Sequence, residues 1–130
     1  MSTSSETTDS DLFRCTATEL GRRLRCGEIS PVDVIESVAS RIEDVNPTIN
    51  ALPVLCLDKA REQAQQMTNH NPPSREKGPL WGLPFAVKDY NDLAGVGTTY
   101  GSPLFARNIA TESDATVKRL QDSGAIAIGK

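Results

Sequence analysis

The stretch GLPFAVKD, residues 82–89, is the most informative part of the sequence. Its apolar residues run without a turn residue into Lys88, which is typical of a short strand inside a protein. Because side chains alternate along a strand, Phe85 and Val87 share one face, and Ala86 and Lys88 share the other. The stretch therefore predicts a buried strand that ends in a lysine.

The residues after this strand predict a loop, a helix and a second strand. Residues 95–102 hold three glycines and two threonines, so their backbone can approach a ligand or another strand closely. A helix is expected to begin at Asp114 and to end at Gly124. Residues 125–128 then form a strand of the buried type, which runs on to Lys130.

Two helices are predicted before this region. The first begins at Thr16, where a Thr-x-x-Glu pattern is a capping box, and ends at Gly27. The second begins at Ser30, which is followed by a proline suited to the first helical position. It is expected to end at Asn46, because the residue before a proline is disfavoured in helices.

The middle of the chain is less regular. Residues 49–57 are apolar but contain a proline, which predicts an edge strand or an irregular segment. Asp58 is expected to cap a polar helix, and residues 69–79 form a surface loop. The inner face of that helix comprises Ala60, Ala64 and Met67. Helices and strands in this order predict an α/β fold with a partly parallel sheet.

Length and composition indicate one soluble domain. The 130 residues suffice for one hydrophobic core, with residues 1–15 as a disordered leader and residues 16–130 as the domain. No secretory signal and no apolar run of membrane-spanning length is visible. The three cysteines lack metal or redox spacing, which favours a reducing, cytoplasmic location. A net charge of −3 gives no basic face for nucleic acid.

Lys88 is the residue that could carry chemistry, and two interpretations compete. An amine held among apolar neighbours loses its proton readily, and a neutral amine is a competent general base. The alternative is a lysine at a strand end with its head in solvent, paired with Asp89 or Asp92. Spacing alone favours the alternative, because structural lysines are common.

Other kinds of site find no support. His70 is the only histidine and lies in the polar loop, so the chain offers no histidine-based triad and no zinc site. The glycines at 95 and 97 lack the remaining residues of a nucleotide-binding loop. We therefore expect neither a metal nor a cofactor.

Four blocks in order resemble the amidase signature family. They are the elbow at residues 27–31, the strand at 82–89, the loop at 95–102 and residues 114–130. The resemblance covers about residues 16–130. It implies the N-terminal part of the amidase-signature fold, an α/β fold with a mixed sheet flanked by helices, truncated at the C-terminus. The last strand is then expected to be an exposed edge.

The resemblance also implies a function. In that family a Ser-Ser-Lys triad hydrolyses amides, and the match makes Lys88 the base that accepts a proton through a bridging serine. Both serines belong to a segment downstream of Lys130, and Ser102 is interpreted as a turn residue. The 130-residue chain alone is therefore expected to be inactive. A small-molecule amide is the expected partner, and the full-length protein could form a homodimer.

Two alternatives remain open. The chain could be a non-catalytic interaction module or pseudogene product of the same fold, pairing its open strand edge with a partner. It could instead be the A-type subunit of a tRNA-dependent amidotransferase, which shares this N-terminal pattern. A downstream segment rich in glycine and serine would favour an enzyme.

Overall fold

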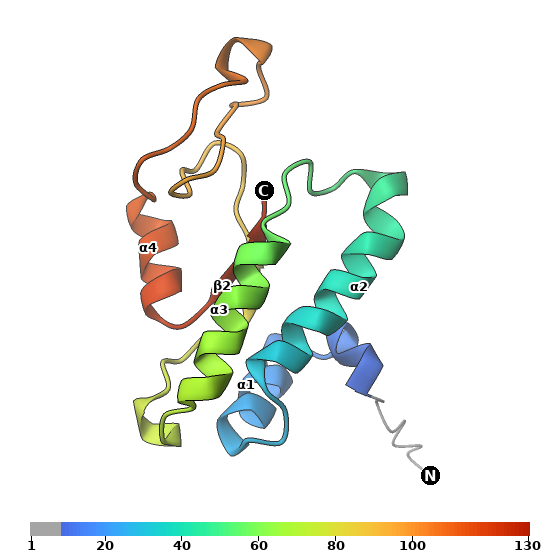
Figure 1. Ribbon diagram of the computed structural model, residues 1–130, viewed down its shortest axis with the longest axis vertical. Helices are drawn as coiled ribbons and strands as arrows, with labels where there is room; N and C mark the ends of the chain where they lie inside the picture. The colour runs from blue at the N-terminus through green and yellow to red at the C-terminus, as the bar shows by residue number, and fades with distance from the viewer. Residues whose placement is uncertain (1–8) are drawn as a thin grey trace.

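The computed structural model describes residues 9–130, in which helices cover a small sheet (Figure 1). None of the helices within these residues is long and apolar enough to cross a membrane. The α-helices are α1 (Ala17–Cys26), α2 (Pro31–Ile49), α3 (Leu57–His70) and α4 (Ala115–Asp122). The strands are β1 (Pro84–Ala86) and β2 (Ile126–Gly129), and short 3-10 helices are η1 (Asp9–Arg14), η2 (Ser74–Glu76) and η3 (Pro103–Phe105).

The sheet has two parallel strands, which agrees with the partly parallel sheet that the order of elements predicts. β1 and β2 pair in parallel, and an isolated antiparallel bridge joins Leu55 to Gly129. The N–H of Cys56 donates to the Ile128 carbonyl at 2.9 Å, and the N–H of Lys130 donates to the Val54 carbonyl at 2.7 Å. The prediction of an exposed last strand is therefore wrong, because the irregular segment before α3 covers the outer edge of β2. Within the described residues, the open edge belongs to β1.

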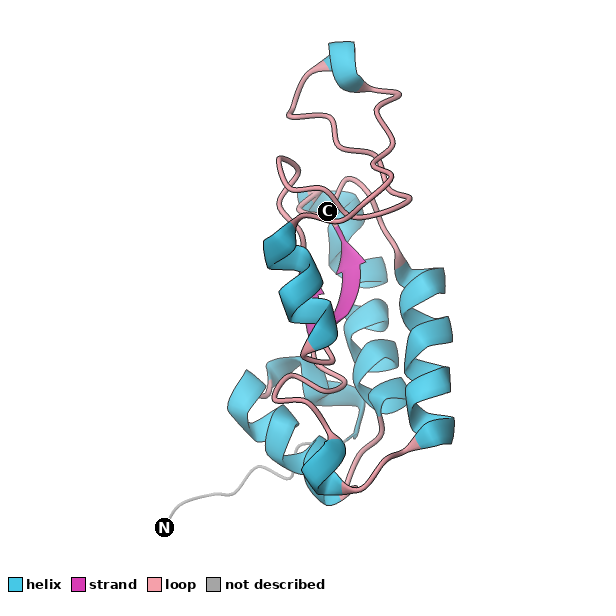
Figure 2. Cartoon of the chain, turned by 90° about the vertical axis from the view of Figure 1, so that its left-hand side faces the viewer, coloured by secondary structure: helices cyan, strands magenta, loops and turns pink. Residues whose placement is uncertain are grey.

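β2 is buried on both faces. Ile126, which is fully buried, packs in a core cluster with residues of α2 and α3. Ala127 contacts a second cluster that includes Val117 of α4. Figures 1 and 2 show the strand enclosed by these helices. Burial on both faces explains the continuous apolar run that predicted this strand.

The predicted capping box is half-formed at the first helix, and the predicted cap at Ser30 begins the second. The N–H of Glu19 donates to the Thr16 hydroxyl at 3.2 Å. The Glu19 carboxylate pairs with Arg22 instead of completing a capping box. At the start of α2 the box is complete, since Asp33 N–H donates to the Ser30 hydroxyl at 3.2 Å and Ser30 N–H donates to the Asp33 carboxylate at 2.7 Å.

Helix α2 continues past the predicted end at Asn46. It includes Pro47 and ends at Ile49, followed by Asn50 in the left-handed region with φ 47°. Pro47 has no N–H to donate to the carbonyl four residues before it, so the last turn of α2 forms without that bond. The Asn46 side chain also exchanges two hydrogen bonds with the backbone of Leu52, at 2.9 and 3.0 Å, which holds the following turn.

Helix α3 has the predicted inner face but a different start. Ala60 and Ala64 are buried, and Met67 packs against the same cluster. The cap position is Cys56 rather than Asp58, and Asp58 lies within the first turn, where a carboxylate favours the helix dipole.

Part of the predicted leader is ordered. Residues 9–14 form η1, and Leu12 is fully buried against the first two helices. The N–H of Phe13 donates to the Ser37 hydroxyl of α2 at 3.2 Å. A disordered segment would have no such contacts, so the prediction for residues 9–15 is wrong. Residues 1–8 of the predicted leader lie outside the described residues.

The loop before β1 is held by the end of α4. Leu80 N–H donates to the Ser123 carbonyl at 3.0 Å, and Gly82 N–H donates to the Gly124 carbonyl at 2.9 Å. Gly124 has φ +98°, a conformation that favours glycine. These contacts bring the beginnings of both strands together and so set their parallel register.

Candidate active site around Lys88

Lys88 lies just beyond the carboxyl end of β1. Val87 is buried, and its N–H donates to the Gly129 carbonyl at 2.9 Å. Phe85 and Val87 contact the core, whereas Ala86 and Lys88 are exposed, so the predicted alternation is confirmed. Ligands of parallel sheets commonly bind beyond the carboxyl ends of the strands, which is where this lysine lies.

The side chain of Lys88 is exposed to solvent, and its amine lies over one aromatic ring. Its Nζ lies 5.1 Å from the centroid of the Tyr90 ring. A hollow of about 300 Å³ here is lined by Lys88, Asp89, Tyr90, Tyr100 and Gly101. The expectation that apolar side chains enclose the lysine is wrong for this chain, because Ala86 and Lys88, which share one face, are both exposed. Neither of the predicted carboxylate partners forms an ion pair with it among residues 9–130.

Asp89 is instead held by other groups. Its Oδ1 accepts from the Thr99 N–H at 3.2 Å and lies 3.4 Å from the Lys130 Nζ, and its Oδ2 accepts a short hydrogen bond from the Thr99 hydroxyl. The Thr99 hydroxyl, then the Thr99 N–H and the Lys130 ammonium, lower the pKa of Asp89 from its ordinary value of 3.8. Asp89 is therefore a carboxylate at neutral pH, turned toward the 97–99 segment.

Lys130 is a residue whose position the sequence analysis did not foresee. Its side chain is fully buried, and Nζ donates to the Thr98 hydroxyl at 2.7 Å and to the Gly97 carbonyl at 3.1 Å. Thr98 is itself buried, which agrees with a structural role for this loop threonine. The signal that could have found it was a lysine that directly follows a buried strand, the same pattern that drew attention to Lys88.

A second polar cluster fixes the turn after Lys88. The Asp114 carboxylate, at the start of α4, accepts from the Asp92 N–H at 3.0 Å and from the Asn91 side chain at 3.1 Å. These bonds, the first being the larger cause, lower the pKa of Asp114 from 3.8. Residues 91 and 92 are thus tied to α4, which orders the backbone beyond Lys88.

The segment 97–109 projects from the rest of the molecule, with η3 near its tip (Figure 1). Its two arms are joined by a bridge between Gly97 and Ile109. Tyr100, with φ +51°, stacks edge-on against Phe105 with ring centroids 5.2 Å apart. This arrangement places the Tyr100 ring beside the hollow that contains Lys88.

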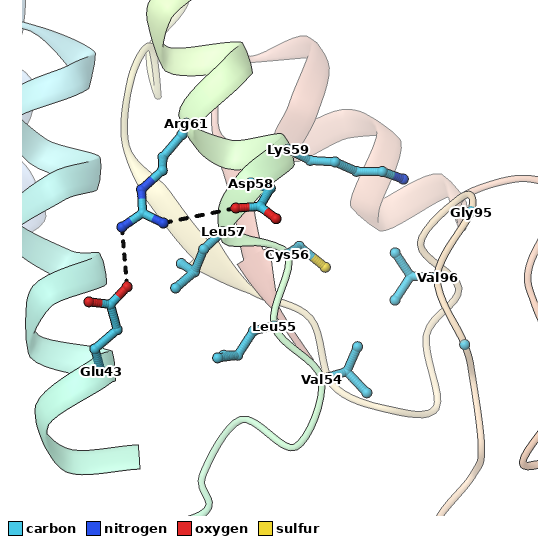
Figure 3. A pocket seen from close by; sticks show the side chains of 11 residues that line it. Glu43, Val54, Leu55, Cys56, Leu57, Asp58, Lys59, Arg61, Gly95 and Val96 are labelled. Atoms are coloured by element: carbon cyan, nitrogen blue, oxygen red, sulfur yellow. Dashed lines mark hydrogen bonds and ion pairs between the residues drawn. The ribbon is translucent and has the colours of Figure 1, made fainter. Parts of the chain in front are cut away.

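A larger hollow than the one beside Lys88 lies elsewhere in the described residues. It has a volume of about 640 Å³ and lies between residues 54–59, residues 95–97 and the side chains of Glu43 and Arg61 (Figure 3). Arg61 forms ion pairs with Glu43 at 3.2 Å and with Glu36 at 2.9 Å, so its charge is compensated. Burial raises the pKa of the Cys56 thiol above 9.0, which disfavours a reactive thiolate. Size alone therefore does not make this hollow the reactive site.

Ser102 and His70 do not line the hollow beside Lys88. The Ser102 hydroxyl accepts from the Leu104 N–H at 3.3 Å, so Ser102 is a turn residue as predicted. His70 ends α3. Among the described residues no group of three or more His, Cys, Asp or Glu side chains is arranged to hold a metal ion.

The sequence of the chain is similar to those of known proteins. The amidase family model matches residues 33–130. An amidase of Pseudomonas putida is 38% identical over 121 residues, which are 93% of this chain and 26% of that protein. The A-type subunit of the glutamyl-tRNA(Gln) amidotransferase of Lachnospira eligens is 32% identical over 119 residues, 92% of this chain and 25% of that protein.

A solved structure described as fatty acid amide hydrolase superposes with a TM-score of 0.85 at 25% identity, covering 94% of this chain and 22% of that one. The chain thus spans about a quarter of the length of the relatives that it matches. Sequence and fold agree, and the chain belongs to the amidase (amidase-signature) family.

Proposed function

We propose that the complete protein containing this chain hydrolyses carbon–nitrogen bonds of linear amides with a Ser-Ser-Lys triad in which Lys88 is the base. The observation that carries the proposal is the position of Lys88 at the carboxyl end of a parallel strand, with no ion pair among the described residues. Membership of the amidase family supports the reaction class.

The proposed reaction is an acyl transfer through two serines supplied by residues outside this chain. The nucleophilic serine attacks the amide carbonyl and forms a carbon–oxygen bond, while its proton passes through the bridging serine to the neutral Lys88 amine. Collapse of the tetrahedral intermediate breaks the carbon–nitrogen bond, and the departing amine takes up the proton. Water then cleaves the acyl-enzyme and releases the acid.

Lys88 must be neutral to begin this cycle, yet its side chain is exposed in the described residues. The proposal therefore requires further residues of the complete protein to cover the hollow. The open edge of β1 and the exposed Ala86 face are the surfaces that such residues would contact.

Three free cysteines in the chain support a cytoplasmic location for the complete protein.

A panel of aliphatic, aryl and fatty amides, with released ammonia or amine as the readout, tests the proposal. The complete protein should turn over at least one of them and be labelled by a serine-hydrolase probe. The 130-residue chain should do neither, because it lacks the paired serines. Labelling of the 130-residue chain, or a complete protein inert toward every amide and toward the probe, would contradict the proposal.

The similarity to an A-type amidotransferase subunit favours one second candidate. In that case the complete protein would liberate ammonia from an amide for use by an associated protein. Tagged complete protein, isolated from its source under mild conditions, separates the two functions. Stoichiometric partner chains would favour the amidotransferase, and a protein active without them would favour the independent amidase.

A further inference from the structure

Lys130 is a buried cation that the proposed reaction does not use. Its side chain is 0% exposed, and its ammonium contacts the Thr98 hydroxyl at 2.7 Å, the Gly97 carbonyl at 3.1 Å and the Asp89 Oδ1 at 3.4 Å. A buried ammonium is costly unless it is paired and hydrogen-bonded, and these three contacts meet that requirement. Lys130 thus joins the end of β2 to both the 97–99 loop and the residue next to Lys88.

Asp89 is the group on which this contact acts. It follows Lys88 directly and lines the same hollow. Its two carboxylate oxygens are directed at the Thr99 N–H, the Thr99 hydroxyl and Lys130. Lys88 forms no ion pair within residues 9–130, although a carboxylate belongs to the next residue.

A carboxylate close to an amine stabilises the protonated form, which cannot act as a base. We propose that Lys130 is a positioning residue for Lys88, because it holds the Asp89 carboxylate against residues 97–99 and away from the Lys88 amine. The catalytic consequence rests on the function proposed above. The arrangement of charges around Asp89 does not rest on that function, and it can be measured in this chain.

Lys130 also lies near Cys56 and Asp114, but neither of these groups would act on the charge of Lys88 as Asp89 does. The charge of Lys130 also reaches the Cys56 thiol and the Asp114 carboxylate. Burial keeps the thiol protonated at neutral pH, and Asp114 is bound by the N–H of Asp92 and by Asn91. The other residues that line the hollow beside Lys88 are Asp89, Tyr90, Tyr100 and Gly101, and the carboxylate among them is that of Asp89. Asp89 is therefore the carboxylate that loss of Lys130 would loosen, because the Thr99 bonds alone would then hold it away from Lys88.

Acetylation of the 130-residue chain tests this step without any enzymatic assay. Acetic anhydride modifies neutral amines, so the rate at Lys88, measured by mass spectrometry at fixed pH against Lys118, follows its neutral fraction. In Lys130→Met the freed carboxylate should lower this rate about threefold, the equivalent of half a pH unit for an exposed pair. Lys130→Arg should retain the parental rate, because the cation remains.

A second substitution separates charge from structure. In the double variant Asp89→Asn with Lys130→Met, no carboxylate is freed, so Lys88 should react as it does in Asp89→Asn alone. An unchanged rate in Lys130→Met, or an equal fall in the double variant, would overturn the proposal. If circular dichroism shows that Lys130→Met is unfolded, Lys130→Gln, which keeps a donor for Thr98, is measured in its place.

The pH profile of the complete enzyme provides an independent test of the proposal. Lys130→Met should move the acid limb of the pH profile of kcat/KM upward by about half a unit, and adding Asp89→Asn should move it back. A merely structural role would lower kcat/KM evenly at all pH values, which would count against the proposal. If the complete parental protein hydrolyses no amide, the proposed function fails, whereas the acetylation result still decides the role of Lys130.

Discussion

Replacing Gly124 by alanine tests how the loop before β1 is packed against the end of α4. A Cβ on Gly124 would lie 2.6 Å from the Cα of Trp81 and 3.0 Å from its backbone nitrogen, closer than such atoms approach. Gly124 also has φ +98°. Gly27 is the matched control, since it has φ +73° and a Cβ there would meet nothing within 4 Å.

Both substitutions place alanine in a left-handed conformation, but only Gly124→Ala also causes a steric overlap. Placing alanine in a left-handed conformation costs about 1 kcal/mol of unfolding free energy at either site. Overlap with backbone adds about 2 kcal/mol at Gly124, because the Trp81 backbone cannot move without disturbing the start of β1. We therefore expect losses of about 1 kcal/mol for Gly27→Ala and about 3 kcal/mol for Gly124→Ala.

Urea unfolding followed by circular dichroism at 222 nm measures both values. The midpoint should fall further for Gly124→Ala, with the slope of the transition unchanged, because the surface exposed on unfolding is the same. Fluorescence of Trp81, the only tryptophan, gives a second probe at the contact itself. Equal losses for the two variants would refute the packing argument.

Two further predictions concern the core and the carboxylates. Ile126→Ala removes a fully buried side chain from the centre of the sheet and should lower the unfolding free energy by about 3 kcal/mol, whereas Ile49→Ala, at a side chain 61% exposed, should cost under about 1 kcal/mol in the same urea assay. The lowered pKa values of Asp89 and Asp114 contribute stability that is present above their ordinary value of 3.8 and is lost as pH falls through the lowered values. Thermal unfolding should therefore show a declining melting temperature in acid, and a flatter decline when both residues are replaced by asparagine; an equally steep decline would contradict this reasoning.

The local features of the fold could be predicted from the sequence because their causes lie within a few residues. Thr16 and Ser30 cap helices through bonds to residues three positions away. The inner face of α3, with Ala60 and Ala64, follows from helical spacing. The end of α2 could not be placed, because Asn46 bonds to Leu52, and that partner offsets the effect of the proline.

The features that could not be predicted from the sequence depend on contacts between residues far apart along the chain. Residues 54–56 cover the edge of β2 although they precede it by more than seventy positions. The hydrogen bonds of the Lys130 side chain are with residues 32 and 33 positions away, and apolar spacing carries no information about them. The pattern around Lys88 correctly predicts the end of a strand and the face on which Lys88 lies. Residues 82–89 do not show whether other residues bury that face.

The kcat of the complete protein carrying Lys88→Ala is the most direct measurement of the role assigned to this lysine. Lys118→Ala, which removes an exposed lysine paired with Glu112, is the control. We expect Lys88→Ala to lower kcat by about a hundredfold to ten-thousandfold with circular dichroism unchanged, and Lys118→Ala to leave kcat near the parental value. A kcat for Lys88→Ala within a few-fold of the parent would show that another group accepts the proton.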